Sequence, residues 1–443
     1  MTTDRVVCQA PGAGRQKFGI GFLCEKHTEA AGCGLTHKCF VPNLWHLTPG
    51  TWLRRLGSTA LVTLSACGGA SHPSLPFSPA DTTPAATPPI TPAPAVHVQG
   101  NHIVDALGRV VRLRGVNRSG TEYACAQGWG MFDGPSDSAS VSAMAAWKAT
   151  IVRIPMNETC WLGINGVKAA YAGAAYRQAI TAYVSLLNRH GMIAVLDLHW
   201  TAAGSAVALA QQPMPNRDHT VEFWRQVATE FRGNDAVIFD LFNEPYPDGN
   251  QDTPEAWRCW REGGACAQLG FTAAGMQELV DTIRATGATN ILLAGGVQYA
   301  SGLSHWLENA PHDPRNNIAA SWHVYNFSGC STATCWNMVA APIAQRVPLV
   351  LGELGEDDGG AAFVNALMDW MDTHGAGYLA WVWDVWGSPL DLIRSYDGTP
   401  TSYGQTFKAR FGQAGVTPIG TQILSPRPGR RAAGPASTPR ATP

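Results

Sequence analysis

The sequence predicts an α/β protein, a single (β/α)8 TIM barrel preceded by a β-hairpin and flanked by disordered segments. Short runs of β-forming residues alternate with amphipathic helical patterns between residues 98 and 412. Eight such runs, each roughly 30–50 residues from the next, are what an eight-stranded parallel barrel requires. The competing fold, an open doubly wound sheet, usually carries a glycine-rich nucleotide loop after its first strand. This sequence has no such loop there, so we favour the barrel.

The elements of this barrel follow one another along the chain. The expected strands comprise residues 110–117, 150–156, 192–200, 236–245, 290–296, 318–326, 347–355 and 377–386. Apolar residues recur at helical spacing in residues 174–191, 219–234, 275–287 and 361–375. Before the first strand, residues 96–111 predict a β-hairpin that turns at Ala106, Leu107 and Gly108. We expect this hairpin to cap the bottom of the barrel.

The two ends of the chain differ in composition from the predicted barrel. Residues 1–69 are interpreted as a leader, residues 70–97 as a linker, residues 98–412 as the folded domain and residues 413–443 as a tail. The linker and the tail are rich in Pro, Ser, Thr and Ala, which bury too little apolar surface to form a core. We therefore expect one domain with disordered flanks.

The leader contains a pattern typical of an export signal. Arg54 and Arg55 precede a short apolar run of small residues that ends at Cys67. Leu64 to Cys67 also resembles the bacterial lipobox, whose cysteine is lipidated. We expect an exported bacterial protein, either secreted or held at the outer surface as a lipoprotein through Cys67. Because this signal lies about 50 residues from Met1, we expect the true translation start near Val41 to Leu47.

The eleven cysteines support the same compartment. After the cysteines of the leader are set aside, six remain in the predicted domain: Cys125, Cys160, Cys259, Cys266, Cys330 and Cys335. An even number in an exported protein indicates disulfides. Proximity in the sequence favours Cys259–Cys266 and Cys330–Cys335, which leaves Cys125–Cys160. Six cysteines allow 15 pairings, so the connectivity stays open at this point.

The composition excludes some functions and favours one. Charged residues make up 14% of the chain and the net charge is −2, so there is no basic face to neutralise the phosphates of a nucleic acid. The chain has 16 Trp against 10 Tyr and 14 Phe. Indole rings offer flat apolar faces that stack on sugar rings, although they also fill large cores. Composition alone leaves both uses of tryptophan open.

Polar residues lie near the ends of several predicted strands, where the active site of such a barrel is built. They are Arg153, Asp197, His199, Asn243, Glu244, His323, Tyr325, Glu353, Trp381 and Trp383. Glu244 follows the fourth strand and Glu353 ends the seventh, so the two carboxylates should face each other across the barrel mouth. Such a pair suits glycoside hydrolysis, in which one group protonates the leaving oxygen and the other attacks the anomeric carbon. His323 and Tyr325 lie two residues apart on one strand, so both side chains should point to the mouth.

Six segments carry a resemblance to a known family. In order, they are IVRIP, LDLHW, FDLFNEP, WHVYNF, LGELG and LAWVWD, and each lies on the expected strand. Across residues 100–411 the sequence resembles the retaining cellulases of glycoside hydrolase family 5. Asn-Glu-Pro alone is a weak signal, whereas six ordered segments together are a specific one.

The resemblance implies a role for each matching residue. It implies that Glu244 is the general acid/base and Glu353 the nucleophile. Asn243 would contact the 2-hydroxyl of the substrate, and Arg153 and Tyr325 would position Glu353. His199 and His323 would line the subsite of the reacting sugar. Trp383 is the expected stacking platform, with Trp381 as the alternative, because both should share one strand face. Among apolar neighbours Glu244 should have a raised pKa and start protonated, while Asp197 and Asp240 are expected to be buried structural acceptors.

The expected activity is that of a retaining endo-β-1,4-glucanase, a cellulase. The alternatives are a β-mannanase or a xyloglucanase on the same scaffold, since loops set specificity in such barrels. A non-catalytic glycan-binding barrel is the alternative from another class, but it should lack one carboxylate. We expect no cofactor and no metal, a β-glucan as partner, and a monomer. Membrane contact would come only through the lipid anchor.

Overall fold

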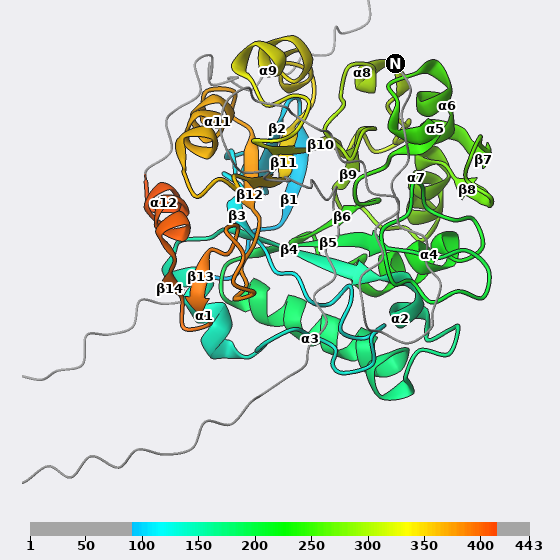
Figure 1. Cartoon of the computed structure of the whole chain (residues 1–443), viewed down its shortest axis with the longest axis horizontal. Helices are drawn as coiled ribbons and strands as arrows, with labels where there is room; N and C mark the ends of the chain where they lie inside the picture. The colour runs from blue at the N-terminus through cyan, green and yellow to red at the C-terminus, as the bar shows by residue number, and fades with distance from the viewer. Residues whose placement is uncertain (1–90, 414–443) are drawn as a thin grey trace, which may run out of the picture. The chain divides into compact units, whose positions relative to one another are not determined.

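The computed structural model describes residues 91–413, which form a closed barrel of eight parallel strands. Around the barrel the strands follow the order β3, β4, β5, β6, β9, β10, β11 and β12, with β12 pairing again with β3. The predicted (β/α)8 fold is therefore confirmed (Figure 1). The predicted leader with Cys67, most of the linker and the tail lie outside the described residues.

All eight predicted strands are present, most of them shorter than expected. The barrel strands are β3 (Arg114–Asn117), β4 (Ile151–Asn157), β5 (Ile193–Trp200), β6 (Val237–Asp240), β9 (Leu292–Gly295), β10 (Ile318–Tyr325), β11 (Leu349–Gly355) and β12 (Gly377–Ala380). Gly115 in β3 is required by close approach, because an added Cβ would lie 1.8 Å from the carbonyl oxygen of Ile151 on β4. The shortening of β6 and β12 places the residues that follow them in loops at the mouth.

Helices cover the outside of the barrel (Figure 1). In α3, Tyr176, Ile180, Val184 and Leu187 are buried at the spacing of one helical face, which packs on the strands. The helices are α1 (Ser138–Ala146), α2 (Glu158–Leu162), η1 (Ala169–Tyr171), α3 (Ala174–Arg189), α4 (Thr220–Phe231), α5 (Pro247–Asn250), α6 (Pro254–Glu262), α7 (Met276–Ala285), α8 (Trp306–Asn309), α9 (Ala333–Val339), α10 (Ala341–Ala344), α11 (Ala362–Thr373) and α12 (Ser402–Phe411). Two further short sheets pair β7 (Gly263–Ala265) with β8 (Thr272–Ala274) and β13 (Ile393–Ser395) with β14 (Thr399–Pro400).

A hairpin closes the bottom of the barrel, as predicted, but its turn lies elsewhere. β1 (Val96–Gln99) pairs with β2 (His102–Asp105), so the chain reverses at Gly100 and Asn101 rather than at residues 106–108. A second tight turn does occupy residues 106–108 and leads to an isolated bridge between Val104 and Val110. Both turns have glycines with positive φ, and the sequence pattern does not rank one above the other. Val96 and Ile103 pack into the apolar cluster that fills the lower barrel interior.

Three disulfides lie in the described domain, and they are the pairings that sequence proximity favours. They join Cys125 to Cys160, Cys259 to Cys266, and Cys330 to Cys335. Disulfides of this kind form and persist in oxidising compartments.

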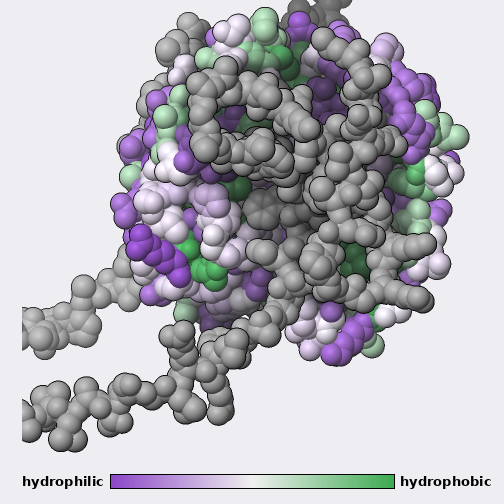
Figure 2. Space-filling view, in the orientation of Figure 1, coloured by the Kyte–Doolittle hydropathy of each residue, from purple (hydrophilic) through white to green (hydrophobic). Residues whose placement is uncertain are grey.

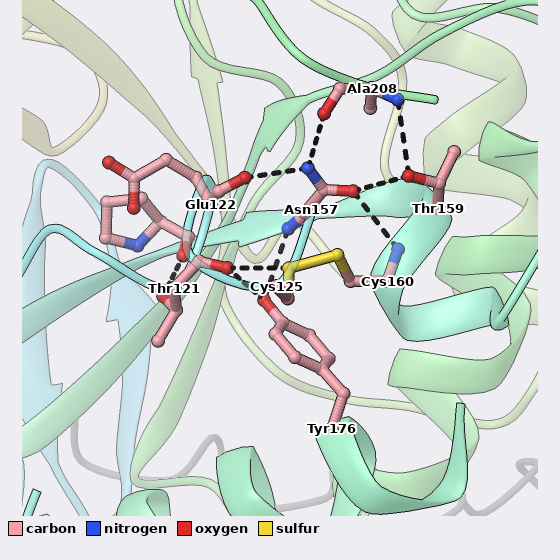
Figure 3. The surroundings of a disulfide bond; sticks show 9 residues. Thr121, Glu122, Cys125, Asn157, Thr159, Cys160, Tyr176 and Ala208 are labelled. Carbon is pink, nitrogen blue, oxygen red and sulfur yellow. Dashed lines mark hydrogen bonds between the residues drawn. A yellow bond between two sulfur atoms is a disulfide. The ribbon is translucent and has the colours of Figure 1, made fainter. Parts of the chain in front are cut away.

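The Cys125–Cys160 disulfide joins the loop after β3 to α2, which follows β4 (Figure 3). Beside it, the Nδ2 of Asn157 donates to the backbone carbonyls of Glu122, at 2.7 Å, and Ala208, at 2.8 Å. Its Oδ1 accepts from the backbone N–H of Cys160 and so caps the start of α2. One buried side chain and one disulfide thus fix the mouth loops after β3, β4 and β5 relative to one another.

The outer surface is mostly polar. On the face seen in Figure 2, hydrophobic residues of the described part form small patches among hydrophilic ones. Within residues 91–413, no helix is both long and apolar enough to span a membrane.

The Cys125–Cys160 disulfide should stabilise the domain more than the other mouth-side disulfide. Chain entropy gives about 4 kcal/mol for a cross-link over 35 residues and about 2 kcal/mol for one over 5 residues. We expect the Cys125→Ser/Cys160→Ser double variant to lose about twice as much free energy of unfolding as Cys330→Ser/Cys335→Ser. Urea unfolding of both variants measures this. Equal losses would contradict the clamp described above.

Candidate active site

A buried arginine organises the centre of the barrel mouth. Arg153 lies on β4 and is fully buried. Its Nε donates to Asp240 at 2.9 Å, and one terminal nitrogen lies 3.0 Å from Asp197. The other terminal nitrogen donates to Glu353 at 2.8 Å, while Asn243 accepts from the guanidinium at 2.9 Å. Burial disfavours the charged guanidinium, but the surrounding carboxylates outweigh it and raise the pKa of Arg153.

Glu353 accepts hydrogen bonds on both of its carboxylate oxygens. Arg153 donates to its Oε1, and the hydroxyl of Tyr325 donates to its Oε2 at 2.6 Å. Burial, followed by the charge of Glu353, raises the pKa of Tyr325 well above its usual value, so this phenol remains a donor. Gly355 leaves room for the Tyr325 ring, because a Cβ at position 355 would come within 2.6 Å of a ring carbon. The side chain of Glu353 is nearly buried.

Glu244 lies on a loop with unusual backbone geometry. β6 ends at Asp240, and Glu244 adopts a left-handed φ of 45°, which costs a non-glycine residue roughly 1–2 kcal/mol. Surrounding hydrogen bonds hold this conformation, since Gln211 donates to the carbonyl of Glu244 and the N–H of Asn243 donates to that of Leu198. The side chain points to the mouth, where its Oε1 lies 3.1 Å from the Nδ1 of His323.

The surroundings of Glu244 favour its protonated form. Burial raises the pKa of Glu244, as expected from the sequence. Burial also lowers the pKa of His323 to about 4, so this imidazole is neutral above roughly that pH. A neutral His323 adds no positive charge that would favour the ionised carboxylate. Glu244 and Glu353 therefore meet opposite environments within one cleft.

His199 forms the opposite wall together with Trp381. Its Nδ1 lies 2.6 Å from the Oδ2 of Asp197. Burial alone would lower the pKa of His199, but the charge of Asp197 outweighs it and the net shift is upward. The imidazole stacks on the ring of Trp381, with centroids 5.9 Å apart and planes 13° apart.

Trp383 was expected to be the sugar platform, and the structure contradicts this. Trp383 is fully buried and packs edge-on against Trp147 of α1, with ring centroids 4.8 Å apart. The prediction assumed a strand that continues to residue 386, on which Trp381 and Trp383 would share a face. β12 ends at Ala380 instead, so the alternation of a strand no longer applies. Trp381, the alternative, is half-buried and stacks on His199 beside the carboxylates.

A second aromatic group flanks the cleft and centres on Tyr123. Rings of Trp129, Trp200 and Trp386 lie 6.0, 6.2 and 6.3 Å from the Tyr123 ring. Trp386 in turn lies 6.5 Å from Trp381. Most of the tryptophans pack in the core instead. Nine tryptophans of the described domain are buried: Trp147, Trp161, Trp224, Trp257, Trp260, Trp306, Trp322, Trp336 and Trp383.

Glu244, His323 and Glu353 are also close enough to be tested as a metal site. One ligand atom from each lies within 4.8 Å of the others, and they are the one such group found among the described residues. The guanidinium of Arg153 already contacts Glu353 at 2.8 Å, and its positive charge opposes a cation at this position. The three residues therefore fit proton transfer and nucleophilic attack by carboxylates better than metal binding.

The sequence placed most of this cluster, and the structure adds four members. Asp197 and Asp240 are buried acceptors, as expected, and their partner is Arg153. Asn117 was missed, although it ends β3 and accepts from Arg153 at 3.1 Å. Tyr123 and Gln211 were also missed, because they lie on loops where no periodic pattern indicates direction. Phe327, next to Tyr325, is the fourth addition.

The fold and the site together define a class of protein. Two carboxylates that face each other at the carboxyl end of a (β/α)8 barrel, beside aromatic rings, are the arrangement of a glycoside hydrolase. A family model described as cellulase (glycosyl hydrolase family 5) matches residues 104–387. The chain belongs to this family and is a hydrolase of O-glycosyl bonds.

Known relatives carry more than one specificity. The chain is 23% identical over 293 residues to the mannan endo-1,4-β-mannosidase of Salipaludibacillus agaradhaerens, covering 65% of this chain and 80% of that protein. It is 27% identical over 236 residues to the manganese dependent endoglucanase Eg5A of Phanerodontia chrysosporium, covering 52% of this chain and 53% of that protein. The structure of the β-glucanase SdGluc5_26A of Saccharophagus degradans in complex with cellotetraose matches the fold with a TM-score of 0.56 at 22% identity, over 75% of this chain and 98% of that chain.

Trp381 and Trp383 provide a matched pair of variants. We expect Trp383→Ala to lower the free energy of unfolding by about 3–5 kcal/mol, because it empties a core position. Trp381→Ala should change stability by less than about 1 kcal/mol, since the residue is half-buried, and instead raise KM for oligosaccharides. Urea unfolding and steady-state kinetics of both variants check this. A normal KM in a folded Trp381→Ala enzyme would contradict the corrected assignment.

Proposed function

We propose that the protein is a retaining endo-β-1,4-glucanase that uses Glu353 as nucleophile and Glu244 as general acid/base. The spacing of the two carboxylates is the observation that carries this proposal. An oxygen of Glu244 lies within 4.8 Å of an oxygen of Glu353. Retaining glycosidases hold their carboxyl groups about 5–5.5 Å apart, whereas inverting enzymes need about 6.5–9.5 Å to admit a water molecule. The spacing found here is nearer to the retaining range than to the inverting range, so direct attack by a carboxylate is favoured.

In the first step Glu353 attacks the anomeric carbon while Glu244 protonates the departing glycosidic oxygen. The donors from Arg153 and Tyr325 fix the orientation of the attacking carboxylate. Glu244 begins protonated because burial raises its pKa, and it loses that proton to the leaving sugar. The products are a shortened glycan and a covalent glycosyl–Glu353 ester.

In the second step water replaces the departed sugar and hydrolyses the ester. Glu244, now ionised, accepts a proton from this water, which attacks the same face of the anomeric carbon from which the leaving group departed. Asn243 assists both steps. Its Oδ1 accepts from Arg153, so its Nδ2 donors face away from the guanidinium, where a 2-hydroxyl of the sugar would lie.

A neutral polymer is the substrate class that fits the rest of the mouth. Aromatic faces lie on both sides of the carboxylates, with Trp129 and Tyr299 each more than two-fifths exposed. Tyr299 stacks on Tyr246 with ring centroids 4.5 Å apart. Sugar rings stack on such faces through their C–H groups, and no charge on the substrate is needed. Exposed aromatic rings that could bind several sugars in a row suit attack within a chain.

The β-mannanase alternative has support of its own, because mannan endo-1,4-β-mannosidases are among the relatives. Several other relatives are named endoglucanases, so the names favour glucan without excluding mannan. A non-catalytic glycan-binding barrel is disfavoured, since both carboxylates and all their partners are in place. Export is part of the proposal as well, supported by the three disulfides and by the signal pattern that ends at Cys67.

Substitution of each carboxylate tests the mechanism. Glu353→Gln should abolish turnover and leave the melting temperature near that of the wild type, because no ester can form. Glu244→Ala should lose most activity on polysaccharide but regain part of it with azide and an aryl cellobioside, which needs no acid. Activity of Glu353→Gln within about tenfold of the wild type would refute the nucleophile assignment. Failure of azide rescue would count against Glu244 as acid/base.

The substrate is tested by a comparison of carboxymethylcellulose, β-mannan and xyloglucan at equal mass concentration. We expect the highest kcat/KM on the β-glucan, with viscosity falling faster than reducing ends appear, because cleavage is internal. Glu353→Gln serves as the blank on each polymer. A clear preference for mannan would replace glucanase by mannanase in the proposal while leaving the mechanism unchanged.

A further inference from the structure

The neighbour of Tyr325 on its exposed side is an aromatic ring to which the mechanism gives no role. Phe327 lies in the turn directly after β10, and 64% of it is exposed. Its ring stacks on the Tyr325 ring, with centroids 5.1 Å apart and planes only 14° apart. A single exposed apolar residue is ordinary on a protein surface, so the stacking of Phe327 on Tyr325, rather than its exposure, is the observation that matters.

The turn fixes Phe327 over Tyr325 through its own backbone. The N–H of Tyr325 donates to the Oγ of Ser328 at 2.9 Å, and the N–H of Ser328 donates back to the carbonyl of Tyr325 at 3.0 Å. The N–H of Asn326 donates to the carbonyl of Gly355 on β11 at 3.2 Å. These hydrogen bonds fix the backbone of the turn and therefore the position from which the Phe327 side chain extends.

Two neighbours restrict the Tyr325 ring. Phe327 stacks on it, and a Cβ at Gly355 would come within 2.6 Å of a ring carbon. The hydroxyl of Tyr325 donates to Glu353 at 2.6 Å. Because Phe327 covers one face of the ring, it limits how far the ring can turn and therefore the direction from which the hydroxyl donates.

We propose that Phe327 is a positioning residue that acts on the nucleophile through Tyr325, by holding the Tyr325 ring in the plane from which its hydroxyl donates to Glu353. This inference rests on the proposed function, because it concerns the same carboxylate. It assigns Phe327 no contact with the reacting sugar. The alternative use of an exposed aromatic face, as a platform for an added sugar, makes different predictions about kcat and KM.

A double-mutant cycle tests the inference with an aryl β-cellobioside and with cellopentaose. We expect Phe327→Ala to lower kcat about tenfold on both substrates with KM within about twofold of the wild type. Tyr325→Phe should lower kcat at least as much. The double variant should be no slower than Tyr325→Phe alone, because Phe327 then has no hydroxyl to orient. Phe327→Tyr, which keeps an aromatic plane, should restore kcat to within about twofold.

Two further readouts separate positioning from a structural effect. Met338→Ala is the matched control, since Met338 on α9 is 68% exposed and lies outside the site; it should leave kcat, KM and the melting temperature unchanged. The ratio of kcat to KM effects is the second readout, because a loss of folded protein would lower the apparent kcat of every variant in proportion to its melting temperature, whereas positioning lowers kcat in a fully folded Phe327→Ala enzyme.

Several outcomes would overturn the inference. Multiplicative losses in the double variant would show that Phe327 acts independently of Tyr325. A rise in KM that is confined to cellopentaose would make Phe327 a sugar platform instead. If Glu353→Gln retains activity, the proposed function fails and this inference fails with it. An inactive Glu353→Gln enzyme with independent losses at Phe327 and Tyr325 refutes the inference alone.

Discussion

A guanidinium without solvent access must be surrounded by acceptors, and Arg153 meets this requirement with groups from several strands of the barrel. A buried, unpaired charge would cost many kcal/mol, so Arg153 can be present only if Asp197, Asp240 and Glu353 converge on it. These partners come from β5, β6 and β11. The same ion cluster therefore closes the top of the barrel and sets the position of Glu353. Replacing Asp197 or Asp240 by an apolar residue would leave the guanidinium without an acceptor in a place that water does not reach, whereas Glu353→Gln keeps an acceptor oxygen beside it.

Arg153 has more carboxylate neighbours than its single positive charge can balance, so the neighbours differ in protonation. Burial raises the pKa of Asp240 to about 7 even though Arg153 lies 2.9 Å away, so the cluster resists a full set of negative charges. Glu353 receives direct donors from Arg153 and Tyr325, whereas Glu244 faces a neutral His323 across the cleft. Two carboxylates within 4.8 Å of each other thus have different partners. Such a division allows one to attack and the other to donate a proton.

The sequence predicts the barrel and its charged cluster because both depend on strands. A run of apolar residues that ends in polar ones indicates where a parallel strand ends, and polar residues at those ends meet at one edge. The structure brings Arg153, Glu353 and His323, which this argument singled out, within contact of one another. Trp383 was not, because β12 ends at Ala380 and the chain beyond it leaves the strand geometry. The hairpin turn was misplaced for a related reason, since residues 100–101 and residues 106–108 both carry turn-forming residues and only packing selects between them.

The strand pattern does not predict the residues that lie on loops. The positions of the aromatic rings around Tyr123 depend on the conformation of the loop after β3, which the Cys125–Cys160 disulfide and Asn157 stabilise (Figure 3). The central claim, that two closely spaced carboxylates act in succession on one anomeric carbon, is tested most directly by the stereochemistry of the first product. Proton NMR during hydrolysis of a cello-oligosaccharide should show the β-anomer of the new reducing end first, with the α-anomer appearing only by mutarotation. Initial release of the α-anomer would contradict the account.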